Sequence, residues 1–271
     1  MRLVRSIILL SVIATPGVIQ SIPPSVQGII DQSARATHED WQRAPSFDFC
    51  EVDQDDKASR TYLVAMIAGS PFSRLVSVNG QHLTSEVAER EARRFDAAVQ
   101  QRQQETPEQH QRRVAQYEKE RRRDQLFLEQ LTQAMEFTLT GIETTDAHKT
   151  FVVNAAPKPG YTAKSIQTAV LSGMRGKLWI DQTSFRWVKV QAEVVHPVMI
   201  EGFVARVLPG TRFELEEKPI DDREIWLPSH FSMQSRALIL LLFLKSSRQD
   251  VTYFHYKANG SLSAQDCLRP E

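Results

Sequence analysis

The sequence of 271 residues lacks the motifs by which most hydrolases and metalloenzymes are recognised. It contains no G-x-S-x-G and no H-E-x-x-H segment, and no two of its seven histidines lie three or four positions apart. Its two cysteines, Cys50 and Cys267, have no histidine or second cysteine at the spacing of a zinc site. We therefore expect no enzyme, no catalytic residues, no metal and no cofactor. A hydrolase whose residues meet only in space, around His196 or His230, is the remaining enzymatic alternative.

The chain also lacks an excess of charge and a long apolar run. Lysine plus arginine and aspartate plus glutamate each total 33, which gives no global attraction to nucleic acid, so we expect no nucleic-acid partner. A membrane-spanning helix needs about 20 apolar residues. Beyond the N-terminus the longest apolar run, 237–244, has eight residues. It predicts a strand buried on both faces, and we expect no transmembrane span in the mature chain.

The first 21 residues have the layout of a secretory signal peptide. Arg2 and Arg5 form a basic start, residues 6–13 are largely apolar, and Pro16 and Gly17 follow. An uncleaved anchor or a buried first helix are the alternatives. Cleavage near residue 21 predicts a periplasmic or secreted protein, most typical of a bacterium. In such an oxidising compartment the two cysteines are candidates for a disulfide, with two free thiols as the alternative.

The remaining chain, 22–271, predicts one mainly antiparallel β domain of the α+β class. Ser25 is a candidate cap for a helix over 26–43, because apolar residues recur there at helical spacing. About ten strand-like segments then follow with short connections and without strand–helix alternation, which argues against a parallel sheet. Residues 186–194 alternate most regularly and place Val188, Val190, Ala192 and Val194 on one face.

A charged helical segment over 84–135 interrupts the strands. Between residues 85 and 124 there are ten basic and nine acidic side chains, and Thr106 with Pro107 marks a second helix start. We expect a long helical hairpin that is solvated at its far end and packed only at its base. Its run of arginines, 121–123, has acidic neighbours and fits a solvated helix, with acidic lipid or nucleic acid as the alternative.

The strands carry a broad aliphatic face that needs a cover. An antiparallel sheet with one dry face is either covered by helices or curls around an apolar ligand. A curled sheet lined by aliphatic and aromatic side chains is a natural site for an acyl chain, and a closed core is the alternative. The candidate ligand-binding residues of this apolar cavity are Leu178, Ile180, Val188, Val190, Phe213 and Leu215.

Four short segments resemble one known family. They are 176–181 (GKLWID), 185–190 (FRWVKV), 209–213 (PGTRF) and 224–228 (EIWLP). In this order they are similar to the LolA/LolB-like family of periplasmic outer-membrane lipoprotein carriers, over about 25–257. The resemblance implies a curved half-open β-barrel with a helical lid, and a cavity that takes acyl chains without covalent chemistry. The segment 84–135 departs from the pattern of the small carriers.

Two functions therefore remain open. The first is an exported, non-enzymatic carrier that binds lipid acyl chains or lipoproteins in an apolar half-barrel cavity, with a lipid or an acylated protein as its partner. The alternative is a protein–protein interaction or sensor module of the cell envelope with a closed core. In that case the charged hairpin binds an envelope protein.

Overall fold

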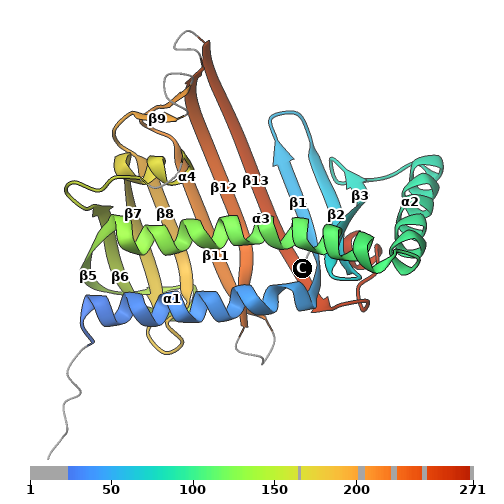
Figure 1. Cartoon of the computed structure of the whole chain (residues 1–271), viewed down its shortest axis with the longest axis horizontal. Coiled ribbons are helices and arrows are strands. Elements are labelled where there is room, and N and C mark those ends of the chain that lie inside the picture. The colour runs from blue at the N-terminus through green and yellow to red at the C-terminus, as the bar shows by residue number, and fades with distance from the viewer. Residues whose placement is uncertain (1–23, 164–165, 201–204, 221–224, 240–242, 269–271) are drawn as a thin grey trace, which may run out of the picture.

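We analysed a computed structural model of the chain that describes residues 24–163, 166–200, 205–220, 225–239 and 243–268. The predicted signal peptide, 1–21, lies outside these residues. Within them, thirteen strands form one antiparallel sheet that is curved and not closed (Figure 1). The fold class predicted from the sequence is confirmed.

The strands follow the order β4-β3-β2-β1-β13-β12-β11-β8-β7-β6-β5, with β9 and β10 attached to β12. Their bounds are β1 Phe47–Asp55, β2 Ser59–Ile67, β3 Ser70–Val78, β4 Gln81–His82, β5 Met135–Thr145, β6 His148–Pro157, β7 Met174–Asp181, β8 Trp187–Val194, β9 Val198–Ile200, β10 Ala205–Val207, β11 Arg212–Ile220, β12 Ile225–Ile239 and β13 Phe243–Ala258. The chain thus enters at the centre of the sheet, leaves through β4, and returns at the opposite edge with β5.

Helix α1, Val26–Arg43, begins where the sequence predicts it. The side chain of Ser25 accepts a hydrogen bond from the amide of Gly28 and so caps the first turn. Ile29 and Ile30 are buried against the sheet. Near its end, Asp40 forms a two-pronged ion pair with Arg186 at 2.6 and 3.2 Å. The helix is therefore held by apolar packing at one end and by a buried charge pair at the other.

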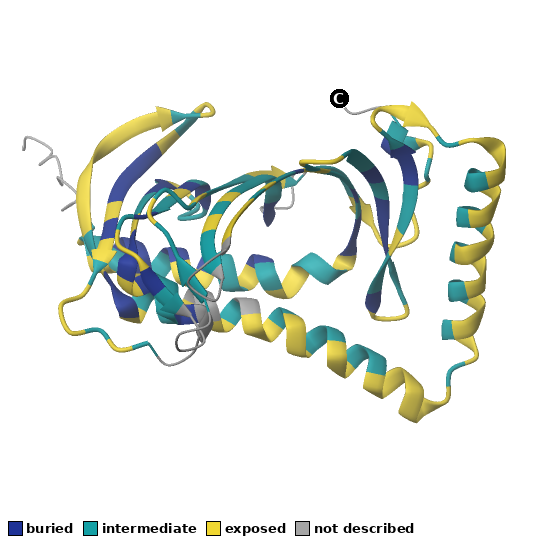
Figure 2. Cartoon of the chain, turned by 90° about the horizontal axis from the view of Figure 1, so that it is seen from above, coloured by how far each residue is buried: buried dark blue, intermediate teal, exposed yellow. Residues whose placement is uncertain are grey.

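Helices α2, Ser85–Gln103, and α3, Pro107–Ala134, form the predicted insertion, and Thr106 and Gln109 make a capping box at the start of α3. They do not lie along each other as a hairpin. Figure 2 shows that α2 stands at one end of the molecule, whereas α3 runs back beneath the sheet beside α1. α1 and α3 together cover one face of the sheet (Figure 1).

The charged side chains of the insertion bind the edge of the sheet. The amide of Leu75 on β3 donates to Glu91, and Arg94 donates to the carbonyl of Ser73. Arg102 donates to three carbonyls in and beside the turn between β2 and β3. These groups would otherwise be an unpaired strand edge open to aggregation. The expectation that the insertion packs only at its base is wrong, because its charges satisfy backbone groups of the sheet.

The middle of α3 is likewise packed. The guanidinium of Arg121 lies 4.0 Å from the ring centroid of Trp41 on α1 and donates to the carbonyl of Trp41. Only 13 % of the Arg121 side chain is exposed. The first arginine of the run 121–123 therefore joins the two covering helices.

Short helical segments complete the chain. They are η1 Ala44–Ser46, α4 Ile166–Ala169, η2 Val170–Gly173 and η4 Asp266–Leu268. Cys267 in η4 is joined by a disulfide to Cys50 in β1, with a Cα–Cα distance of 5.4 Å. Both cysteines are buried with Leu63 and Val76. The C-terminal tail is thereby tied to the first strand across 217 positions.

The apolar run 237–244 does not form a strand buried on both faces. Its described residues end β12 and begin β13, and the two strands extend as a ribbon beyond the body of the sheet (Figure 1). Leu244 is 59 % exposed. Residues 240–242 lie outside the described part. The prediction failed because an apolar run has the same sequence pattern in a buried strand and at an exposed tip.

Candidate functional site

Two adjoining cavities lie between the sheet and its covering helices. The inter-helix cavity, about 560 Å³, is bounded by α1, α3 and the sheet, and its wall includes Ile30, Leu131 and Phe137. The sheet cavity, about 190 Å³, lies deeper and has a wall of apolar atoms. Leu131, Leu178 and Trp187 border both. The two cavities therefore adjoin and share part of their walls, with a combined size typical of a small-molecule site.

The sheet cavity exists because one row of the sheet carries the smallest side chains. Ala155 on β6, Gly176 on β7 and Ala192 on β8 are direct neighbours across three strands. A Cβ atom placed on Gly176 would lie 3.7 Å from that of Ala155 and 3.9 Å from that of Ala192. Phe213 on β11 ends the row beside Ala192. The floor is hollow because these residues leave space that larger side chains would fill.

Larger predicted residues form the adjacent row. Leu178, Val190 and Leu215 are cross-strand neighbours on β7, β8 and β11. With Phe213, they border the sheet cavity. Four of the six residues predicted from the sequence thus meet at one cavity wall. The remaining two, Ile180 and Val188, are not among the residues that line either cavity.

Ile180 is fully buried and belongs to the same core cluster as the wall residues, next to Phe151 and Trp187. Val188 lies on the opposite face, in a cluster with Val152, Trp179 and Trp226. A bulge shifts the register between β7 and β8, so that Trp187 pairs with Ile180 and Val188 is left over. The alternation expected for 186–194 fails at Val188 for that reason, and Trp187 takes its place on the cavity side.

Polar residues border the inter-helix cavity where it reaches the surface. Arg35 and Glu39 on α1 and Glu129 on α3 are exposed and line it. Nε2 of Gln125 lies within hydrogen-bond distance of Nδ1 of His38, at 2.9 Å across the two helices. A ligand that enters between α1 and α3 therefore meets a polar rim first and an apolar interior next.

A buried charge cluster lies at the end of α1 away from the sheet cavity. The side chains of Asp40 and Arg186 are 5 % and 11 % exposed. Burial raises the pKa of Asp40, although its hydrogen bonds with Arg186 act in the opposite direction. Glu217 on β11 lies nearby, and loss of hydration together with the charge of Asp40 raises its pKa to about 8. Arg186 therefore pairs with Asp40, and the half-buried Glu217 is the carboxyl group of this cluster that holds a proton near neutral pH.

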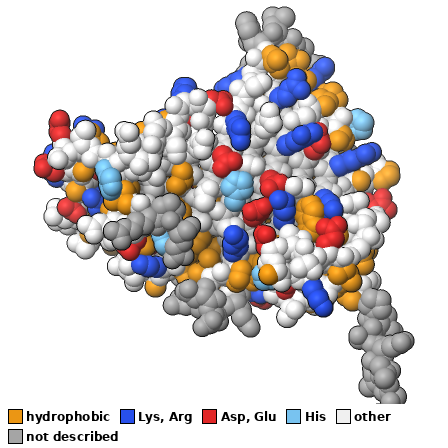
Figure 3. All heavy atoms as spheres, turned by 180° about the vertical axis from the view of Figure 1, so that it is seen from behind, with side chains coloured by type: hydrophobic (Ala, Val, Ile, Leu, Met, Phe, Trp, Pro, Cys, Tyr) orange, Lys and Arg blue, Asp and Glu red, His pale blue; other side chains and the backbone are white. Residues whose placement is uncertain are grey.

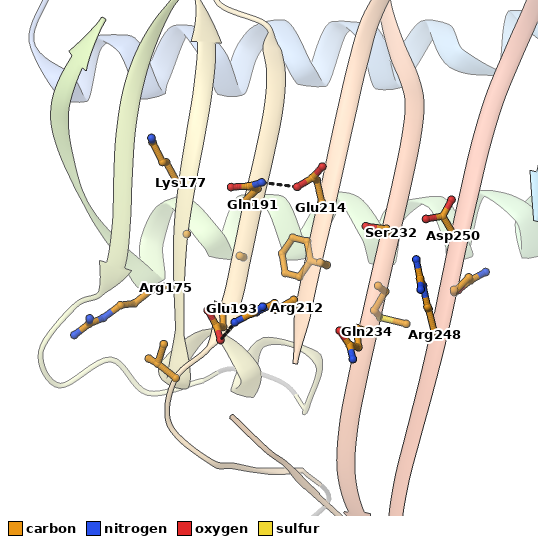
Figure 4. A pocket seen from close by; sticks show the side chains of 16 residues that line it. Arg175, Lys177, Gln191, Glu193, Arg212, Glu214, Ser232, Gln234, Arg248 and Asp250 are labelled. Atoms are coloured by element: carbon orange, nitrogen blue, oxygen red, sulfur yellow. Dashed lines mark hydrogen bonds and ion pairs between the residues drawn. The ribbon is translucent and has the colours of Figure 1, made fainter. Parts of the chain in front are cut away.

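The face opposite the helices is polar and charged. Figure 3 shows basic and acidic side chains intermixed over it. A groove of about 800 Å³ crosses β7, β8, β11, β12 and β13 on this face, and Figure 4 shows the side chains that line it. Arg212 pairs with Glu193 at 3.0 Å and Gln191 donates to Glu214. The charged side chains of the groove include both signs and largely neutralise one another.

A cluster of Glu214, Glu216 and His230 on this face has the composition of a metal site. The ammonium of Lys189 lies 2.7 Å from Glu214 and 2.9 Å from Glu216 and serves as their cation. Burial acts to lower the pKa of Lys189, but the two carboxylates leave it raised. His230 bonds Asp250 at 3.1 Å, and none of the serine hydroxyls described here bonds to His230. The cluster fits an internal ion-pair network better than a metal or a hydrolase site.

The fold and the cavities define an open, curved sheet with two helices as a cover and an apolar interior.

No protein-family model matches the sequence, and no curated protein matches it. Among solved structures, a LolA superfamily protein from Nitrosomonas europaea is similar, with 12% identity over 90% of this chain and 97% of that one and a TM-score of 0.32.

Two further solved structures are similar to the chain. One is a putative outer membrane lipoprotein-sorting protein domain from Vibrio parahaemolyticus, with 10% identity, 88% and 96% of the two chains covered, and a TM-score of 0.30. The other is a DUF1329 family protein from Desulfovibrio piger, with 11% identity, 88% and 95% covered, and a TM-score of 0.30. The first two structures bear the family names predicted from the sequence motifs. At these values the likeness carries no argument about function, which rests on the residues of this chain.

None of the helices in the described residues is both long and apolar enough to cross a bilayer.

Proposed function

We propose that the protein is an exported carrier that binds the acyl chain of a lipid or lipoprotein between its sheet and its two covering helices. The observation that supports this most strongly is the pair of adjoining apolar cavities. A row of small residues, Ala155, Gly176 and Ala192, keeps the deeper cavity open. Unfilled apolar volume lowers stability, so it is a cost to the fold unless a ligand occupies it.

The shape of the site suits an amphiphile. An acyl chain would pass between α1 and α3, leave its polar end at the rim near Arg35 and Glu39, and extend past Leu178 into the sheet cavity. Ten buried methylene groups would contribute roughly 8 kcal/mol before the cost of ordering the chain. Binding of this kind needs no covalent step, so the proposal includes no catalytic residue and no cofactor.

The proposed location is the periplasm or another secreted compartment. The predicted signal peptide supports export, and the disulfide between Cys50 and Cys267 suits an oxidising environment. The alternative of an interaction module that acts through the charged insertion has less support. Arg94, Arg102 and Arg113 on that insertion bind backbone or side-chain groups of β2 and β3 and are not free for a partner.

A fluorescent fatty acid tests the proposal directly. Trp187 borders both cavities and Trp41 borders the wider one, so a bound anthracene-labelled fatty acid accepts their excitation energy. We expect saturable energy transfer with one probe per protein, and competition by an unlabelled fatty acid. Transfer that rises linearly with the probe and is not displaced would contradict a defined site. Replacement of Trp187 by Phe should reduce the signal and preserve most of the affinity.

A further inference from the structure

An apolar and basic patch lies at the end of the ribbon formed by β12 and β13. Leu238 and Leu244 are paired across the two strands and so share one face. Arg206 on β10 pairs with Leu238, and Met199 on β9 pairs with Arg206 on the other side. These four residues form one row across four strands. On the same face, Arg236 lies two positions from Leu238 along β12, and Arg248 lies four positions from Leu244 along β13. We call these six residues the tip patch.

The tip patch faces away from the covering helices. Alternate residues of β12 point to one face, so Leu238 and Arg236 lie on the same side as Ser232, which lines the groove of Figure 4. Seen from that side, hydrophobic side chains gather beside this end of the molecule, with lysine and arginine side chains next to them (Figure 3). The tip patch is therefore separate from the proposed acyl-chain site.

The segment 234–248, which contains the end of β12 and the start of β13, carries charge of one sign. From 234 to 248 the sequence contains Arg236, Lys245 and Arg248 and no acidic residue. Lys245 is exposed on the other face of the ribbon. Arg236 and Arg248 form no ion pair with another described residue, whereas Arg212 below them is paired with Glu193. Within the described residues, these two guanidinium groups are thus not neutralised by an ion pair.

The apolar part of the tip is exposed. Leu244 is 59 % exposed and Leu238 partly so. In the sequence, the run 237–244 is apolar throughout. Exposed apolar side chains gathered at one end and bordered by basic ones are a feature of surfaces that contact membranes. A run of eight residues is too short to span a bilayer and suits only the headgroup boundary.

We propose that the tip patch docks the protein on an anionic lipid surface. Leu244 and Leu238 would enter the boundary between headgroups and acyl chains, while Arg236, Arg248 and Arg206 would lie at the level of the phosphates. Each basic side chain near an anionic membrane adds attraction that falls off within a Debye length. These basic side chains favour a lipid surface over a second copy of the chain, whose own tip patch would repel them.

Vesicle flotation of the full mature protein tests the proposal. The vesicles contain phosphatidylglycerol and phosphatidylethanolamine in equal parts, and vesicles of phosphatidylcholine alone serve as the neutral comparison. We expect binding to the anionic vesicles, a decrease with added salt, and at least a tenfold loss of partitioning for Leu244→Asp. A second variant, Arg236→Glu with Arg248→Glu, should lose binding to anionic vesicles to a similar extent.

Matched variants control for general adsorption. Ile142 is 64 % exposed and lies on the edge strand β5, with four strands between β5 and β12 in the sheet order, so Ile142→Asp should leave vesicle binding unchanged. Arg93 on α2 is exposed and serves in the same way through Arg93→Glu. Because all five substituted positions are exposed, the variants should melt like the wild type.

Three results would overturn the proposal. They are the absence of wild-type binding to anionic vesicles, equal losses for Leu244→Asp and Ile142→Asp, and self-association without lipid that Leu244→Asp abolishes. The last would identify a second copy of the chain as the occupant. The docking proposal and the acyl-chain proposal can be refuted independently, because a variant that closes the sheet cavity, such as Ala192→Leu, leaves the tip patch intact.

Discussion

Replacing Ala192 by leucine should fill the sheet cavity, and so weaken ligand binding without lowering the stability of the fold. Ala192 faces the cavity and has Gly176 and Phe213 as its cross-strand neighbours, so the added carbons enter empty space. Leucine adds three carbon atoms, and at about 0.8 kcal/mol for each buried methylene their burial contributes up to about 2.4 kcal/mol to folding. We therefore expect Ala192→Leu to be as stable as the wild type or more so.

The same carbons displace the end of the acyl chain. If about three methylene groups lose their place, affinity falls by about 2.4 kcal/mol, or roughly fiftyfold. Titration with the labelled fatty acid measures this loss, and urea unfolding measures the stability. A fatty acid that is three or four carbons shorter should bind Ala192→Leu and the wild type with nearly equal affinity, because its acyl chain ends before the filled space.

An exposed alanine provides the control. Ala97 on α2 is exposed and remote from both cavities, so Ala97→Leu should change neither quantity appreciably. The reasoning is refuted if Ala192→Leu folds stably and binds the labelled fatty acid with wild-type affinity. A filled core in the wild type predicts a different outcome, since the added leucine would then overpack it and cost about 1–3 kcal/mol of stability.

Three further predictions concern the supporting structure. Arg186→Gln should lower the free energy of unfolding by about 3–5 kcal/mol, because it leaves the buried carboxylate of Asp40 without its cation, and limited proteolysis should then cut within α1 earlier than in the wild type. Glu217 has a pKa of about 8 in the folded protein, against 4.5 ordinarily, so between about pH 4.5 and 8 the folded state keeps a proton that the unfolded state releases, and stability falls as pH rises through that window. Glu217→Gln should make the urea midpoint less dependent on pH there and should raise the free energy of unfolding at pH 8 by on the order of 1–3 kcal/mol. An unchanged dependence of the urea midpoint on pH would contradict this. Replacing both Cys50 and Cys267 by alanine should cost about 2–5 kcal/mol, and unfolding of the wild type with and without reductant should show a loss of the same size.

Local signals in the sequence predict the N-terminal helix well. Ser25 and the spacing of Ile29 and Ile30 place α1 because a cap and an apolar stripe depend only on neighbours along the chain. The antiparallel sheet is predicted for the same reason, from turn residues and short alternating segments. Part of the cavity wall follows as well, since Val190 alternates with the polar residues Lys189 and Gln191 on its strand.

The row of small residues that keeps the sheet cavity open could not be predicted from local sequence signals. Ala155, Gly176 and Ala192 matter only as a row, and their alignment depends on the register of three strands. The bulge that turns Val188 away and Trp187 inward is likewise a property of strand pairing. Small residues leave no distinct pattern along a single strand, so the sequence indicates an apolar face without showing where it is hollow.

The charged insertion shows a second limit. Composition alone predicts a solvated arm, because charged side chains usually face water. Arg94 and Arg102 instead donate to carbonyl groups of the β3 edge and of the turn before it, and Arg121 stacks on Trp41. Each contact joins residues at least 21 positions apart, and no periodic pattern indicates such partners.

Native mass spectrometry of the mature protein, purified from the exported fraction without detergent, tests the central claim most directly. The account predicts a bound lipid or acylated peptide in stoichiometric amount, which solvent extraction releases and identifies, and which Ala192→Leu retains in smaller amount or with a shorter chain. A wild-type mass equal to that of the polypeptide alone, unchanged after incubation with lipid vesicles, would contradict it.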